Sequence, residues 1–233
     1  MGEENQIKRK ISCYTLWFAG ATFLCMQGIK LEAWEEDFDY SKWLGPDWRN
    51  ELKAFRKDKT VSTYVCNHAS GMYDIFTMMQ VTKGTCAFVA SSFLKNVPCI
   101  RQSIDAGDGI YVDRDASAKD RNRLVDTISE RQAAVELRQT NRKPITIFSE
   151  GLCSIGGIAK LRRGAFNSLR AVQPIVLLQE PGLVYLGCYS SNDHCPILAG
   201  MCTLALSKFK VISLPPFIPN DHLYSGRPDT PKW

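Results

Sequence analysis

Short apolar runs alternate with helical patterns along most of the chain, and this alternation limits the fold more than any other feature. The runs STYVCN, CAFVA, DGIYVDR and PITIFS predict strands. Between the last two lie residues 116–138, where apolar residues recur at helical spacing among charged ones. Strands that alternate with helices form a mostly parallel sheet covered by helices. We therefore expect an α/β fold, a single domain with a mostly parallel central sheet flanked by helices.

Weaker patterns complete this outline. Apolar runs at residues 174–178, 183–189 and 209–217 predict further strands, and the last is stopped by proline. Helical patterns cover residues 74–82, 162–170 and 197–207.

An uncharged apolar stretch at residues 11–29 precedes the alternating region and follows the basic residues KRK. About 20 apolar residues cross a bilayer core, so the stretch is just long enough for a transmembrane helix, although polar residues dilute it. The alternatives are a helix in the membrane interface, a buried core helix and a cleaved signal; Glu3 and Glu4 disfavour the signal. We expect a membrane-associated helix within residues 1–34 and the α/β domain at 35–233.

Composition excludes several classes of function. The net charge of +5 suits anionic partners such as lipid headgroups, phosphates or CoA. No nucleic-acid-binding module is visible, so we expect no nucleic acid partner. The nine cysteines contain no CxxC pair and predict free thiols, and the three histidines lack ligand spacing, so we expect no metal site.

Polar residues that could carry chemistry follow three of the predicted strands. His68, Arg114 and Glu150 each stand just past a strand, and the carboxyl ends of parallel strands are where sites collect in such sheets. Asp74 follows His68 closely enough to orient its ring, which would make His68 a general base. The plainer interpretations are a histidine that caps a helix and an arginine paired with a neighbouring aspartate.

A glycine-containing loop with a basic cluster follows Glu150. Loop amides from Gly151 onward, together with Lys160, Arg162 and Arg163, could cradle a phosphate. A solvated basic start of a helix is the alternative.

Taken in order, five blocks resemble the glycerolipid and lysophospholipid acyltransferase family, 1-acylglycerol-phosphate acyltransferases included. The blocks are CNHASGMYD, GIYVDRD, FSEGLCS, KLRRGAF and VQPIVLL, and the resemblance covers roughly residues 37–180. It implies that His68 deprotonates the hydroxyl of a lysophospholipid or glycerophosphate, which attacks the thioester of acyl-CoA. It also implies that Asp74 orients His68, and that Arg114 and the loop after Glu150 hold the headgroup phosphate. The co-substrate acyl-CoA then suffices, and no cofactor is expected.

The blocks depart from the family pattern at the catalytic pair. The family has four residues between His and Asp, whereas five lie between His68 and Asp74 here, so Tyr73 stands at the family's Asp position. Asp74 regains its place only if Gly71 bulges. Ser149 and Leu152 also replace the usual residues around Glu150.

Two hypotheses follow. The chain is a membrane-bound acyltransferase that acts on lysophospholipids, or it is a catalytically degenerate pseudoenzyme of the same fold with a structural or lipid-binding role as a subunit of a larger membrane complex. The mitochondrial inner membrane and the endoplasmic reticulum both fit. The distance between His68 and Asp74 discriminates between the hypotheses.

Overall fold

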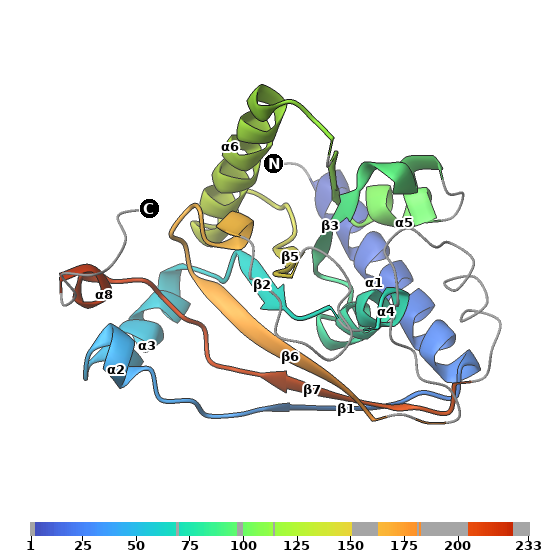
Figure 1. Cartoon of the computed structure of the whole chain (residues 1–233), viewed down its shortest axis with the longest axis horizontal. Coiled ribbons are helices and arrows are strands. Elements are labelled where there is room, and N and C mark those ends of the chain that lie inside the picture. The colour runs from blue at the N-terminus through green and yellow to red at the C-terminus, as the bar shows by residue number, and fades with distance from the viewer. Residues whose placement is uncertain are drawn as a thin grey trace.

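The computed structural model of the chain describes residues 3–68, 70–96, 100–113, 115–150, 163–180, 182 and 205–225. Strands and helices alternate along these residues, as the sequence predicts (Figure 1). The strands are β1 (Lys30–Glu35), β2 (Thr63–Cys66), β3 (Ala87–Ser91), β4 (Ile110–Val112), β5 (Ile145–Phe148), β6 (Val172–Glu180) and β7 (Lys208–Ser213). The helices are α1 (Glu3–Met26), α2 (Ser41–Leu44), α3 (Trp48–Asp58), α4 (Met72–Val81), α5 (Ile100–Ala106), α6 (Ala118–Glu136) and α8 (Asp221–Ser225), with the 3-10 helices η1 (Ser92–Asn96) and η2 (Arg163–Ala165).

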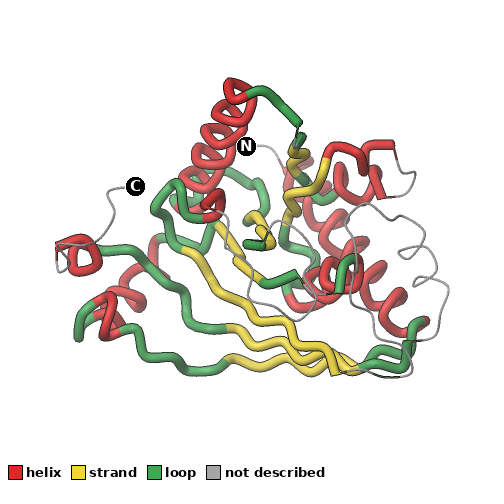
Figure 2. The backbone as a smooth tube through the Cα atoms, viewed as in Figure 1, coloured by secondary structure: helices red, strands yellow, loops and turns green. Residues whose placement is uncertain are grey.

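The described strands form one sheet in the order β1-β7-β6-β2-β5-β3-β4. The pairs from β6 to β4 are all parallel, and β1 is parallel to β7. The one antiparallel pair in this order joins β6 to β7. The prediction of a mostly parallel sheet is therefore confirmed, and the carboxyl ends of β6, β2, β5, β3 and β4 lie at one edge. Figure 2 shows the strands in yellow with the helices in red.

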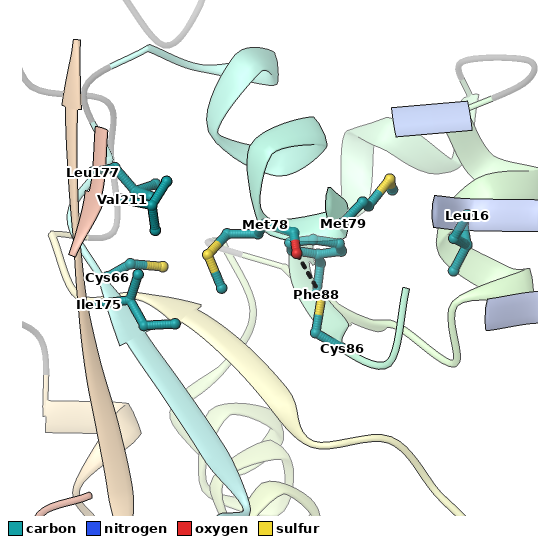
Figure 3. Packing of buried hydrophobic residues seen from close by; sticks show 9 residues of the cluster. All are labelled: Leu16, Cys66, Met78, Met79, Cys86, Phe88, Ile175, Leu177 and Val211. Carbon is teal, nitrogen blue, oxygen red and sulfur yellow. Dashed lines mark hydrogen bonds between the residues drawn. The ribbon is translucent and has the colours of Figure 1, made fainter. Parts of the chain in front are cut away.

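Helices cover both faces of the sheet because its strands carry apolar side chains on both sides. On one face, Ile145 and Ile110 pack with Ile128 of α6. On the other face, Met78 of α4 packs with Cys66 and with side chains of β6 and β7. Figure 3 shows Met78 turned towards the sheet and Met79 turned towards Leu16 of α1. The layers therefore run α6, sheet, α4 and α1.

The amino-terminal helix α1 packs on the domain. Leu16 and Leu24 are buried in clusters that also hold residues of α4 and of the sheet. At Gly84, after α4, an added Cβ would lie only 2.0 Å from the main-chain oxygen of Cys13, so the two backbones touch. The expected boundary between residues 34 and 35 falls inside β1, all six residues of which pair with β7.

The expectation that residues 11–29 form a transmembrane helix is not supported. Among the described helices, none is long and apolar enough to cross a membrane. The basic residues at 8–10 lie within α1 itself, and its polar residues lower its mean hydropathy. Leu16 and Leu24 are buried as in the alternative of a core helix, whereas Tyr14 and Phe18 on the same helix are exposed.

Several predicted elements need correction. In place of the predicted helix at 162–170, the described residues 163–170 form only η2 and a turn, in which the Leu169 amide donates to the Phe166 carbonyl. Residues 205–207 of the predicted helix at 197–207 are not helical, while most of that helix and the predicted strand at 183–189 lie outside the described residues. Strand β1 is not predicted at all, because three of the six residues of KLEAWE are charged and the strand is mostly exposed.

Candidate active site

His68 and Asp74 are paired in the folded chain. Nδ1 of His68 lies 2.9 Å from Oδ2 of Asp74. His68 follows the carboxyl end of β2, whereas Asp74 lies in the first turn of α4, where the helix dipole favours a carboxylate. The Asp74 side chain is 1% exposed and that of His68 17% exposed, so the carboxylate is shielded while the ring keeps access to solvent. The geometry is that of a base and the group that orients it.

Gly71 absorbs the additional residue between them. Gly71 precedes α4 with φ 57° and ψ −119°, a conformation that a residue with a Cβ rarely adopts. The turn continues with a hydrogen bond from the Tyr73 amide to the Ser70 carbonyl. The helix therefore begins in a register that points Asp74 at His68.

Tyr73, at the family's Asp position, points away from the histidine. Its ring packs in a cluster with Leu24 of α1 and Phe209 of β7. Its hydroxyl lies 3.4 Å from Oε1 of Gln27, and burial raises the pKa of the phenol. The tyrosine therefore belongs to the packing between α4 and α1.

Main-chain and side-chain hydrogen bonds fix the loop that carries His68. Nδ2 of Asn67 donates to the Leu177 carbonyl at 2.8 Å, and Oδ1 accepts from the Leu177 amide at 2.7 Å. The Ser70 amide donates to Oδ2 of Asp74 at 2.8 Å, and the Ser70 hydroxyl donates to Oε1 of Gln179. The loop is thus attached to β6 at two points and to the catalytic carboxylate at one.

Phe148 of β5 holds the imidazole from one side. The two rings stack with centroids 4.1 Å apart and planes 18° apart. Because Nδ1 faces Asp74, Nε2 is the ring nitrogen left to exchange a proton with a substrate. Among the described residues, no hydrogen bond to Nε2 competes for it.

Glu150 lies two residues after β5 and reaches the same edge of the sheet as His68. Cys66 pairs with Phe148 across the parallel strands, and the Ser149 amide donates to the Cys66 carbonyl at 3.0 Å. Burial raises the pKa of the Cys66 thiol well above its ordinary value, and the charges of Asp74 and Glu150 add to the shift. Cys66 therefore stays a neutral thiol beneath two carboxylates and is a poor nucleophile.

Most of the expected phosphate-binding residues cannot be placed. Arg114, Gly151, Lys160 and Arg162 lie outside the described residues. The backbone of Arg163 begins η2, and its side chain is not among those described. Their role stays a prediction.

Asn67, Ser70, Phe148 and Gln179 are site residues that the sequence does not single out. The position of Asn67 next to His68 in the CNH block could have identified it as a site residue. No sequence feature identifies Gln179, because its contact with Ser70 spans 109 residues of chain. In the described part of the chain, no group of three or more His, Cys, Asp or Glu side chains is placed to hold a metal ion.

Comparisons with known proteins bear on the family and the fold of the chain. The sequence model of the family described as Acyltransferase matches residues 52–178, which include His68, Asp74 and Glu150. The structure is similar to the crystal structure of the 1-acyl-sn-glycerophosphate (LPA) acyltransferase PlsC from Thermotoga maritima. The TM-score is 0.55 and the sequence identity 14%, with 93% of this chain and 73% of that chain covered. Comparison with curated proteins gave no match.

Proposed function

Because the chain belongs to the acyltransferase family, we propose that it transfers an acyl chain from acyl-CoA to the free hydroxyl of a lysophospholipid or glycerophosphate. The observation that carries this proposal is the 2.9 Å contact between Nδ1 of His68 and Oδ2 of Asp74. A chain without acyltransferase activity would not require a buried carboxylate in contact with an accessible imidazole.

In the proposed reaction, Nε2 of His68 takes the proton of the acceptor hydroxyl while its oxygen attacks the thioester carbonyl. A carbon–oxygen bond forms, and the tetrahedral intermediate then breaks its carbon–sulfur bond. The departing CoA sulfur takes the proton back from the imidazolium, so the enzyme returns to its starting state. Asp74 stabilises the imidazolium while it exists and keeps the ring in the tautomer with a free Nε2.

The remaining roles come from the family resemblance. Arg114, the Glu150–Gly151 turn and the basic residues Lys160, Arg162 and Arg163 are proposed to hold the headgroup phosphate. Three of these residues are arginines and one is a lysine, and their positive charges suit a phosphate dianion.

We also propose that α1 lies on a membrane surface, where the lipid substrates reside. Ile7, Ile11, Tyr14 and Phe18 recur at helical spacing and are exposed, Tyr14 by 71% and Phe18 by 67%. The basic residues 8–10 lie at the amino-terminal end of the helix, between Ile7 and Ile11 in the sequence. Such a helix buries its apolar face in the interface and attracts anionic lipids. The packed face with Leu16 and Leu24 keeps it attached to the domain.

The decisive test is acyl transfer from labelled acyl-CoA to a panel of lysophospholipids and glycerol 3-phosphate. Wild type should turn over at least one acceptor, and His68→Ala should lose at least about a hundredfold in rate. His222→Ala, which alters a histidine of α8, serves as the matched control and should keep wild-type turnover. Absence of turnover in the wild type, with copurification in a large membrane complex, would instead establish the degenerate-subunit alternative.

Membrane attachment needs its own measurement. Phe18→Ser should weaken sedimentation with anionic vesicles by roughly tenfold, since it removes a large apolar side chain from the interface. Trp34→Ser, at an exposed aromatic residue on β1, is the control and should leave vesicle binding unchanged.

A further inference from the structure

Helix α1 packs along α4, the helix whose first turn carries Asp74 (Figure 1). The two main chains approach closely at Gly20 of α1, where an added Cβ would lie 3.0 Å from the Phe76 carbonyl oxygen. A side chain also joins the helices, since Nε2 of Gln80 donates to the Trp17 carbonyl. A change in the position of α1 would therefore displace α4 as well.

Phe23 of α1 reaches the part of α4 that holds the catalytic carboxylate. Its ring stacks on the ring of Phe76, with centroids 4.0 Å apart and planes 23° apart. It also meets the ring of Tyr73 at a centroid distance of 5.4 Å. Contacts between aromatic rings have a preferred geometry and stabilise more than the buried area alone. Phe23 thus contacts the residue before Asp74 and the second residue after it.

The geometry of a helix places these two contacts opposite His68. Successive residues are rotated by about 100° around the axis, so Tyr73 and Phe76 share a face and Asp74 projects about 130° away from the middle of that face. Nδ1 of His68 lies on the Asp74 side, 2.9 Å from Oδ2. Phe23 therefore supports α4 from the side that faces away from His68, and its packing opposes movement of Asp74 away from the imidazole.

The end of α1 that carries Phe23 is itself held by the domain. The carbonyl of Gln27 accepts a hydrogen bond from the Ala205 amide at 3.0 Å, just before β7. Phe209 of β7 contacts Tyr73, with ring centroids 6.4 Å apart. The sheet therefore fixes the position from which Phe23 supports α4.

The hydrogen bonds of Asp74 do not fix α4 by themselves. Among the described residues, Oδ2 contacts Nδ1 of His68 and accepts from the Ser70 amide, and both of these groups belong to the loop before the helix. Oδ1 has no partner among the described residues. The carboxylate is thus bonded only to the loop, and its place relative to the sheet depends on how α4 is packed.

We propose that Phe23 is a positioning residue of the active site, through which α1 keeps Asp74 in contact with His68. The side chain touches no reacting group and acts through the two aromatic residues beside Asp74. Helix α1 is then part of the catalytic apparatus as well as a surface for lipid. The inference rests on the proposed function in treating His68 as the base, but the contact that it explains can be measured without turnover.

The Nδ1 proton of His68 reports this contact directly by nuclear magnetic resonance. A proton shared between an imidazole nitrogen and a carboxylate resonates at low field, and its absence from His68→Ala identifies it in the full chain labelled with nitrogen-15 at histidine. Phe23→Ala should move this resonance upfield, towards its position in Asp74→Asn. Leu16→Ala removes packing between α1 and Met79, beyond the first turn of α4, and should leave the resonance in place.

Kinetics measure the consequence for catalysis. The acceptor is hexanoyl lysophosphatidic acid, which dissolves as monomers, so membrane attachment does not enter. Phe23→Ala should lower kcat at least about tenfold with KM within about twofold, since a displacement of about 1 Å costs up to roughly a hundredfold in rate. Leu16→Ala should keep kcat within about twofold of the wild type. Phe23→Leu loses the ring but keeps an apolar side chain, and it replaces Phe23→Ala, with the same expected direction, if the latter does not fold.

The outcomes separate this inference from the proposed function. An unmoved resonance in a folded Phe23 variant, an equal shift in Leu16→Ala, or a moved resonance with unchanged kcat would each overturn the positioning role. A shift confined to the Phe23 variants, without turnover in the wild type, would support the role of Phe23 in the contact and refute the proposed function. Turnover in the wild type with no effect of Phe23→Ala would refute the positioning role alone.

Discussion

Oδ2 of Asp74 lies 2.9 Å from Nδ1 of His68, although five residues separate the two in the chain. The same oxygen accepts a hydrogen bond from the Ser70 amide, so the carboxylate holds the ring and the loop together. Its other oxygen, Oδ1, is buried and has no partner among the described residues. The charge of Asp74 is therefore directed at the imidazole, where it would stabilise a cation.

Replacing Asp74 by asparagine should lower kcat by about 10²- to 10⁴-fold, because the amide keeps the shape but not the charge that stabilises the imidazolium. The measurement is steady-state acyl transfer with a checked far-UV spectrum. Asp126→Asn removes an exposed carboxylate on α6 and should leave kcat unchanged. A value of kcat for Asp74→Asn within about twofold of wild type contradicts the assigned role.

Gly71→Ala should uncouple the catalytic pair. At φ 57° and ψ −119° a Cβ adds strain of about 1–3 kcal/mol, and relief of that strain shifts the start of α4. A shift of about 1 Å costs roughly a hundredfold in rate. We expect kcat to fall with KM nearly unchanged, while urea unfolding reports the strain separately. Loss of stability with full kcat at saturating substrate would show that Gly71 does not set the register.

The sequence predicts which residues lie at the ends of the strands better than it predicts the contact between His68 and Asp74. His68, Glu150 and Arg114 each follow a predicted strand, and the parallel sheet indeed brings the ends of β2 and β5 to one edge. The 2.9 Å contact depends instead on the conformation of Gly71 and on the bond from Ser70 to Gln179. Such a conformation is selected by tertiary contacts, and a count of residues between His and Asp cannot reveal it.

The edge strand shows a second limit of sequence patterns. Strand β1 carries Lys30, Glu32 and Glu35, and most of its side chains are exposed. Its place in the sheet comes from main-chain pairing with β7 and from the bridge of Lys208 to Glu32. Helix α3 is not predicted either, although Trp48, Leu52 and Phe55 are buried at helical spacing.

Asn67→Ala should destabilise the fold and displace His68. The amide and carbonyl of Leu177 would lose their partners, at a cost of about 1–3 kcal/mol for each buried group. Urea unfolding measures the loss, and Asn50→Ala on the exposed face of α3 is the control. A change below about 0.5 kcal/mol would mean that water replaces the side chain without penalty.

Tyr64 gives the stability a dependence on alkaline pH. Burial raises the pKa of its phenol to about 12. The folded state therefore keeps the proton between pH 10 and 12, while the unfolded state loses it. The stability from this group is complete below pH 10 and falls by roughly 2–3 kcal/mol as the pH rises through 12.

Tyr64→Phe removes this ionisation, so its unfolding free energy should fall less than that of the wild type between pH 9 and 11.5. The measurement is urea unfolding at several pH values. Tyr14→Phe changes an exposed phenol on α1 and should follow the wild type. Parallel curves for all three proteins would show that the Tyr64 phenol ionises equally in both states.

Gly84→Ala should loosen α1 from the domain. Gly84 has φ +70°, and a Cβ there would lie 2.0 Å from the Cys13 carbonyl oxygen, so either the turn or the helix must move. The left-handed conformation alone costs about 1 kcal/mol or more in a residue with a Cβ. Leu16, which packs against Met79 of α4, should then become more accessible. Hydrogen exchange in residues 12–24 should quicken, and the free energy of unfolding should fall.

Gly164→Ala is the control for this change, because an added Cβ there meets no atom within 4 Å. Its unfolding free energy should stay within about 0.5 kcal/mol of the wild type. If Gly84→Ala lowers global stability but leaves exchange in α1 unchanged, the helix is held by its apolar contacts alone. If exchange in α1 quickens while the sheet stays protected, α1 opens independently of the catalytic layer. In that case a membrane surface can draw the helix away without disturbing the contact between His68 and Asp74.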